Sequence, residues 1–190
     1  RGFTGPMAGV DGHFGLIEVF GGSDTDVAAL TRDLGAEYAI SKVWVKAYPC
    51  CGLIHSVSHA IEAIRAETSL TPADVKEIVV HTSRRAVEHN GDPNPQETMA
   101  AQYSIPYCAG AAVVRDPRDP AAFDADGLRD PEIRRVAALT QLRIDEKMDA
   151  LYPAHFAARV AVTLSNDRTA ERTIIDPHGT AYDACDAAEI

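Results

Sequence analysis

Residues 42–64 form the segment KVWVKAYPCCGLIHSVSHAIEAI, which holds the strongest structural and chemical pattern in the chain. Its first part alternates apolar and polar side chains, which is typical of a strand and predicts one over residues 40–47. Small residues at 50–52 predict a tight turn. Apolar residues then recur at helical spacing, so the pattern predicts a helix over 53–67.

The same segment gathers several chemically able side chains around the predicted turn. Lys46 lies at the end of the expected strand, while His55 and His59 lie four residues apart on one face of the expected helix. The start of a helix presents unpaired N–H groups and the positive end of its dipole. We therefore expect the turn to favour an anion.

The overall charge excludes some classes of partner. The chain of 190 residues carries a net charge of -10, and no basic stripe is present to neutralise phosphates, so we predict no nucleic-acid partner. The same charge disfavours an anionic membrane surface, and no apolar run approaches the ~20 residues of a spanning helix. The four cysteines do not suggest a disulfide framework, and reduced thiols in a cytoplasmic protein are the simplest interpretation.

Further elements follow along the chain. The order of helices and strands predicts an α+β fold, with an antiparallel or mixed sheet of about four or five strands and helices packed on one face. The other expected helices span 10–20, 24–34, 96–115 with a break at Pro106, and 130–139; the expected strands span 75–83, 142–148, 157–164 and 169–175, with a polar loop at 84–95 and a linker at 116–127.

Three phrases together resemble the MmgE/PrpD family, which includes the iron–sulfur-independent 2-methylcitrate dehydratases. They are KAYPCCGLIHS at 46–56, AQYSIPYCAGA at 101–111 and RGFTGP at 1–6, in the family's order and approximate spacing. The resemblance covers nearly all of this chain but less than half of a family member. Because the chain opens on Arg1 in mid-phrase and ends without a clear stop, we expect a fragment, a processed subunit or one of two chains.

The resemblance implies a division into domains. Residues 1–36 would be the terminal helices of a mostly missing all-helical domain, 37–177 an α+β lid domain, and 178–190 a tail that leads back to the helical domain. The active site would lie between the two domains. The implied partners are that N-terminal helical domain, on the same or a separate polypeptide, and a second copy in a homodimer.

The resemblance also implies an activity. It predicts part of a metal-independent, cofactor-independent lyase or isomerase: a dehydratase, decarboxylase or epimerase that transfers a proton next to a carboxylate of a small di- or tricarboxylic acid. The implied catalytic residues are Lys46 and Tyr107, and we add His55 as the nearest imidazole, one helical turn on from Cys51. The expected substrate-binding residues are Lys46, Cys51 and Ser104. Cys51 stands roughly where some members place a catalytic histidine. The chain alone would be inactive, because half of the cleft is missing.

Other interpretations stay open at this point. The chain could be a structural or ligand-binding subunit that completes the cleft of a partner chain without a catalytic group. Cys50, Cys51, His55 and His59 could hold zinc, although adjacent cysteines rarely ligate one tetrahedral ion. Cys51 could be a nucleophile at a helix N-terminus. Packing of the two thiols beneath the turn is the simpler role.

Overall fold

The computed structural model describes residues 2–22, 24–38, 40, 43–186 and 188, and the chain divides into two compact units at Lys42 and Val43. Among its described residues, the first unit contains the short helix α1 (Leu16–Gly21) and the 3-10 turn η1 (Val27–Leu30). The helices predicted over 10–20 and 24–34 are therefore much shorter than expected, and by themselves they do not make an all-helical domain. Their large apolar side chains are exposed, including Phe14, Phe20 and Leu34.

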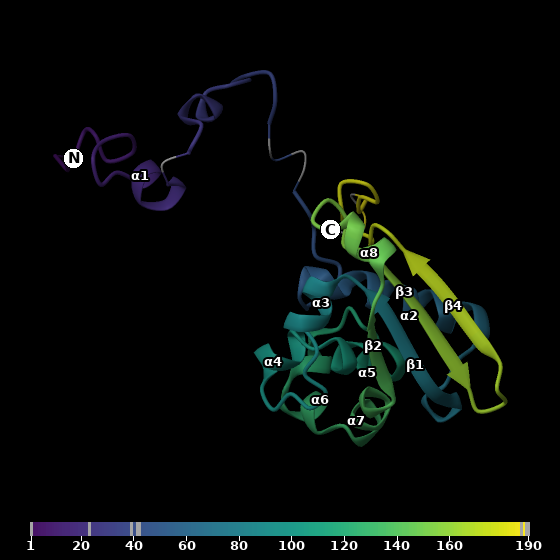
Figure 1. The fold of residues 1–190 in the computed structure, drawn as a ribbon. Helices are drawn as coiled ribbons and strands as arrows, with labels where there is room; N and C mark the ends of the chain where they lie inside the picture. The colour runs from purple at the N-terminus through teal and green to yellow at the C-terminus, as the bar shows by residue number, and fades with distance from the viewer. Residues whose placement is uncertain (1, 23, 39, 41–42, 187, 189–190) are drawn as a thin grey trace. The chain divides into compact units, whose positions relative to one another are not determined.

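The second unit is built on a four-stranded mixed sheet (Figure 1). Its strands are β1 (Val75–Thr82), β2 (Thr140–Ile144), β3 (Ala158–Leu164) and β4 (Thr169–Ile174). Their spatial order is β2-β1-β3-β4; β1 pairs parallel to β2 and antiparallel to β3, and β3 pairs antiparallel to β4. The prediction of an α+β fold with a mixed sheet is confirmed.

Alternation of side chains decides which face of the sheet is buried. Ile78 and Val80 of β1 lie opposite Val162 and Val160 of β3, and all four are fully buried. The β3–β4 hairpin predicted from Asn-Asp forms as expected, with Asp167 in the left-handed conformation at φ 63°. Such a conformation is more accessible to Asn, Asp and Gly than to other residues.

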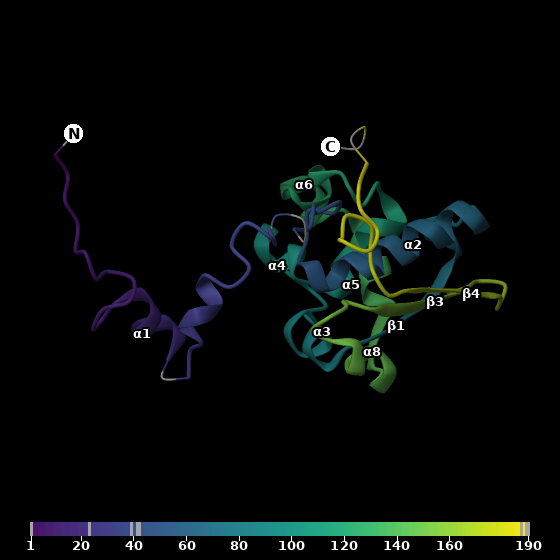
Figure 2. The same ribbon diagram turned by 90° about the horizontal axis from the view of Figure 1, so that it is seen from above.

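Helices α2 and α5 cover the buried face of the sheet, whereas α8 lies on the opposite side (Figure 2). The 3-10 turn η3 (Gly52–Ile54) leads directly into α2 (His55–Thr68), which confirms the predicted helix. The other helices and turns are η4 (Pro72–Asp74), α3 (Arg84–His89), α4 (Thr98–Gln102), α5 (Ile105–Val114), η5 (Pro120–Phe123), α6 (Ala125–Arg129), α7 (Pro131–Ala138) and α8 (Glu146–Leu151). No helix among the described residues is long and apolar enough to cross a membrane.

The core fills the space between the sheet and these helices. Ile61 and Ile64 of α2 and Val113 of α5 are among its largest fully buried side chains. Helices α5 and α7 approach closely at Gly110, where an added Cβ would lie only 2.5 Å from the carbonyl oxygen of Ile133. The helix predicted over 96–115 is interrupted, but before Pro106: α4 ends at Gln102 and α5 starts at Ile105, so Pro106 lies in the first turn of α5.

The strand predicted over 40–47 is wrong for its described residues 43–47, which form no strand. The backbone N–H of Val45 donates to the carbonyl oxygen of Gly179 at 2.8 Å, and among the described residues no neighbouring strand completes a ladder. Trp44 packs instead against Phe156, with ring centroids 4.8 Å apart. Residues 41–42 lie outside the described part of the chain.

Three segments predicted as a loop, a strand and a linker contain helices. Within the predicted loop 84–95, α3 forms because the Ser83 hydroxyl accepts a hydrogen bond from the backbone of Ala86. The predicted strand 142–148 ends at Ile144, where Asp145 caps α8. The predicted linker 116–127 contains η5 and the start of α6.

Candidate functional site

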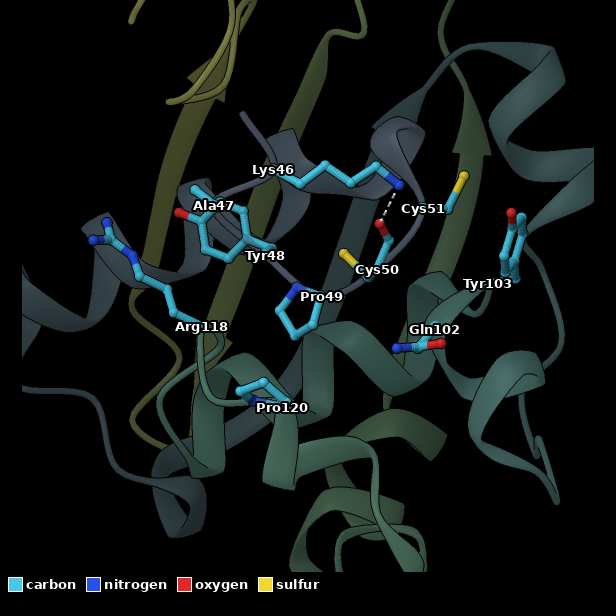
Figure 3. Close-up of a pocket in the computed structure, with 10 residues that line it drawn as sticks. All are labelled: Lys46, Ala47, Tyr48, Pro49, Cys50, Cys51, Gln102, Tyr103, Arg118 and Pro120. Carbon is cyan, nitrogen blue, oxygen red and sulfur yellow. Dashed lines mark hydrogen bonds between the residues drawn. The ribbon is translucent and has the colours of Figure 1, made fainter. Parts of the chain in front are cut away.

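A cavity of about 420 Å³ lies beside the turn that precedes α2. Figure 3 shows its lining, which comes from three separate parts of the second unit. The lining residues are Lys46, Ala47, Tyr48, Pro49, Cys50 and Cys51 from the turn, Gln102 and Tyr103 from the end of α4, and Arg118 and Pro120 from the segment after α5.

The backbone of the turn is held in place on both sides. The N–H of Cys51 donates to the carbonyl oxygen of Gln102 at 2.8 Å, which ties the turn to the end of α4. The Cys51 carbonyl accepts from Ile54 at 2.9 Å, so the turn continues into the helix. The Lys46 ammonium donates to the carbonyl oxygen of Cys50 at 3.2 Å. The lysine side chain therefore lies over the turn, although the residue remains exposed.

One side of the cavity is a closed hydrogen-bonded cluster of Tyr48, Glu62 and Arg118, which we call the closed side. The Tyr48 hydroxyl donates to Glu62 at 2.7 Å, and Arg118 pairs with the same carboxylate oxygen at 3.2 Å. The Arg118 guanidinium also lies 5.8 Å from the centre of the Tyr48 ring. Burial and the adjacent Glu62 carboxylate raise the pKa of Tyr48 well above its ordinary value. The phenol therefore stays neutral and acts as a donor.

The other side of the cavity is formed by Lys46, Cys51, Gln102 and Tyr103, which we call the open side (Figure 3). Cys51 is half-buried, and the phenol ring of Tyr103 is largely exposed. Within the described residues, the side chains of Cys51, Gln102 and Tyr103 make no hydrogen bond. The open side therefore presents a cation and three polar groups to whatever enters the cavity.

Cys50, which also lines the cavity, interacts with Cys108, and both are buried free thiols. Interaction with the Cys108 thiol lowers the pKa of Cys50; the His55 ring and the Lys46 ammonium add to this lowering, and burial opposes it. Burial raises the pKa of Cys108. No group of three or more metal-ligating side chains occurs in the described ranges, so the zinc interpretation gains no support.

Comparison with known proteins places this chain in a family. The sequence model of the MmgE/PrpD C-terminal domain matches residues 48–190. The chain belongs to the MmgE/PrpD family. A cis-aconitate decarboxylase of Aspergillus terreus (strain NIH 2624 / FGSC A1156) is 24% identical over 156 residues, which cover 77% of this chain and 32% of that protein. This MmgE/PrpD chain thus spans about a third of that relative's length.

The structure brings together only two of the residues that the family resemblance singled out. Lys46 and Cys51 both line the cavity. His55 is buried at the start of α2, edge-on to Tyr48, and its Nε2 atom has no hydrogen-bond partner among the described residues. The arrangement places His55 behind the turn rather than in the cavity lining.

Tyr107 and Ser104 lie at the buried start of α5, away from the cavity lining. The Tyr107 hydroxyl donates to the carbonyl oxygen of Ala122 at 2.6 Å. The Ser104 hydroxyl caps α5 by accepting from the backbone of Tyr107 at 3.0 Å, and it donates to the carbonyl oxygen of Asp92 at 2.5 Å. In this structure both side chains hold the local fold.

Sequence reasoning missed four polar residues that line the cavity: Tyr48, Gln102, Tyr103 and Arg118. Gln102 and Tyr103 lie inside the phrase AQYSIPYCAGA, next to the residues that were selected from it. Arg118 lies in a stretch predicted to be a linker. Around Arg118 the sequence shows only a positive charge between two Asp-Pro pairs. This local pattern does not reveal the contact with Glu62, which lies 56 residues earlier in the sequence.

Proposed function

We propose that this chain is part of a lyase or isomerase that transfers a proton next to a carboxylate of a small di- or tricarboxylic acid, without a metal ion. Membership of the MmgE/PrpD family and the similarity to a cis-aconitate decarboxylase support this proposal. The observation that carries it is the Lys46 ammonium at the open side of a cavity large enough for a small carboxylic acid.

The chemistry explains why a lysine is needed there. Removing a proton from a carbon next to a carboxylate places negative charge on the carboxylate oxygens, and a cation nearby stabilises that charge. An ammonium has three N–H donors, of which Lys46 uses one on the carbonyl oxygen of Cys50. The remaining donors can bind a substrate carboxylate.

The partners belong to the proposal as well. We expect a helical domain, on the same or a separate polypeptide, to supply the other wall of the cleft, and we expect the complete enzyme to be a homodimer. The 190-residue chain alone would then turn over no substrate. Full activity of this chain without the helical domain would contradict the split site.

Lys46→Ala in the complete protein tests the function directly. Removing the ammonium is expected to lower kcat/KM by about 10²–10³, the usual effect of losing one group that stabilises transition-state charge. The assay uses 2-methylcitrate, citrate, cis-aconitate and iminodisuccinate. The free energy of unfolding should change little in this variant, because Lys46 is exposed.

Lys147→Ala is the matched control, since Lys147 is an exposed lysine on α8, on the other side of the sheet. It should leave kcat/KM unchanged. If Lys46→Ala also leaves turnover unchanged and only lowers stability, the chain is better described by the alternative, a structural or ligand-binding subunit that contributes no catalytic group.

A further inference from the structure

Proton transfer in this cavity needs a side chain that can both accept and donate a proton. Six lining residues carry a titratable group: Lys46, Tyr48, Cys50, Cys51, Tyr103 and Arg118. The two cations are suited to binding carboxylates rather than to removing protons from carbon. Four candidates for proton transfer remain: Tyr48, Cys50, Cys51 and Tyr103. They differ in burial and in hydrogen bonding.

Two of these candidates are already engaged within the fold. The Tyr48 hydroxyl is fully buried and donates to Glu62. Cys50 is 6% exposed and interacts with the Cys108 thiol behind the turn. Using either group would require breaking contacts that hold the turn in place.

The remaining two candidates, Cys51 and Tyr103, have no side-chain hydrogen bond within the described ranges and lie on the open side with Lys46 (Figure 3). Tyr103 is 52% exposed. Hydrogen bonds hold the backbones of both residues, that of Cys51 to Gln102 at 2.8 Å and that of Tyr103 to Met99 at 3.1 Å. Cys51 is half-buried, so its side chain is more confined than that of Tyr103. A positioned group transfers protons more effectively than a mobile one.

We propose that the Cys51 thiol is the proton-transfer group of this site, acting on a carbon whose carboxylate is bound by Lys46. The inference rests on the proposed function. The thiolate sulfur takes the proton, so an S–H bond forms and the C–H bond breaks. The electron pair moves into the carboxylate as an enediolate, which faces the Lys46 ammonium. The same step in reverse returns the proton from sulfur to carbon.

Alkylation tests the geometry of Cys51 and Lys46 independently of the enzyme assay. Iodoacetate carries a carboxylate next to its reactive carbon, whereas iodoacetamide is neutral and of nearly the same size. In either reaction the cysteine thiolate displaces iodide from the reagent, and an S–C bond forms. If Lys46 binds the carboxylate, the ratio of the iodoacetate rate to the iodoacetamide rate at Cys51 should exceed the ratio at Cys185 by about tenfold or more.

Peptide mass spectrometry on the intact protein measures both rates at every cysteine. Cys185, a free and only partly buried thiol outside the cavity lining, is the internal reference. The selectivity for iodoacetate should disappear in Lys46→Gln. A ratio at Cys51 equal to that at Cys185, or a ratio unchanged in Lys46→Gln, would overturn the inference.

Substitutions at Cys51 test the proton transfer itself in the complete protein. Cys51→Ala and Cys51→Ser should each lower kcat by about 10²-fold or more with KM nearly unchanged, and Cys51→His, whose imidazole also exchanges protons, should recover part of that loss. Cys185→Ser is the matched control and should behave as the parent protein. If Lys46→Ala abolishes turnover while Cys51→Ala retains it, Cys51 is excluded and the proposed function stands; if both retain turnover, the proposed function fails as well.

Discussion

The two sides of the cavity differ in how their polar groups are satisfied. On the closed side, Tyr48 and Arg118 share the carboxylate of Glu62. On the open side, Cys51 and Tyr103 have no such partner within the residues that the structure describes. Both sides have a cation and a phenol, so their composition is similar. They differ because the phenol of the closed side is hydrogen-bonded within the protein, whereas that of the open side has no such bond among the described residues.

This difference separates polar groups that stabilise the fold from those available to a ligand. A buried polar group without a partner destabilises a protein, so the fully buried Tyr48 hydroxyl needs Glu62. Groups on the open side face the cavity and can exchange water for a ligand. We therefore expect substitutions on the closed side to affect stability first, and substitutions on the open side to affect activity first.

Glu62→Ala should have the largest effect on stability. It leaves the buried Tyr48 hydroxyl without an acceptor and Arg118 without its ion pair, which costs about 1–3 kcal/mol of unfolding free energy. Urea denaturation followed by circular dichroism measures the change. Glu62→Gln is the control, because its amide oxygen can still accept the Tyr48 hydrogen bond and should restore more than half of the loss. Equal destabilisation by both variants would show that the charge of Glu62, rather than its acceptor oxygen, stabilises the closed side.

Alkaline pH should weaken the closed side next. Burial and Glu62 raise the pKa of Tyr48 in the folded protein, whereas the unfolded chain has an ordinary tyrosine pKa of about 10. Above that value the unfolded chain loses its proton first, so the stabilisation is complete below pH 10 and is lost as pH rises. The loss should approach about 1 kcal/mol by pH 11.

Tyr48→Phe tests this pH dependence, since it removes the titrating group while keeping the ring. Urea midpoints measured between pH 8 and 11 should fall less steeply for the variant than for the parent protein. Parallel curves for the two proteins would assign the alkaline loss to other groups.

Local sequence signals predicted much of the fold correctly. The buried strand Val75–Thr82, the hairpin at Asp167 and helix α7 after Asp130 and Pro131 all follow from short-range rules of alternation, turn chemistry and capping. The sequence also contained a signal for helix α3, because Ser83 is a good capping residue. The polar composition of the segment nevertheless suggested a loop.

The strand predicted over 40–47 failed because a strand needs a neighbour. The alternation of Val43, Trp44 and Val45 is genuine, yet it reflects Trp44 packing on Phe156 while both valines stay exposed. Long-range contacts also determine which residues line the cavity. Lys46 and Cys51 were found from their own segment, whereas Arg118 joins the cavity through contacts with Glu62 and the Tyr48 ring, both far away in sequence.

Removing one hydroxyl from each side of the cavity gives the smallest and most direct comparison. Tyr48→Phe should lower the unfolding free energy by about 1 kcal/mol, because it deletes a buried 2.7 Å hydrogen bond to Glu62. Tyr103→Phe should change it by less than about 0.5 kcal/mol, because the exposed hydroxyl has no partner within the described residues. If Cys51 transfers the proton, Tyr103→Phe should also keep kcat within about threefold of the parent value. A loss near that of Cys51→Ala would instead make the Tyr103 phenol the proton-transfer group of the open side.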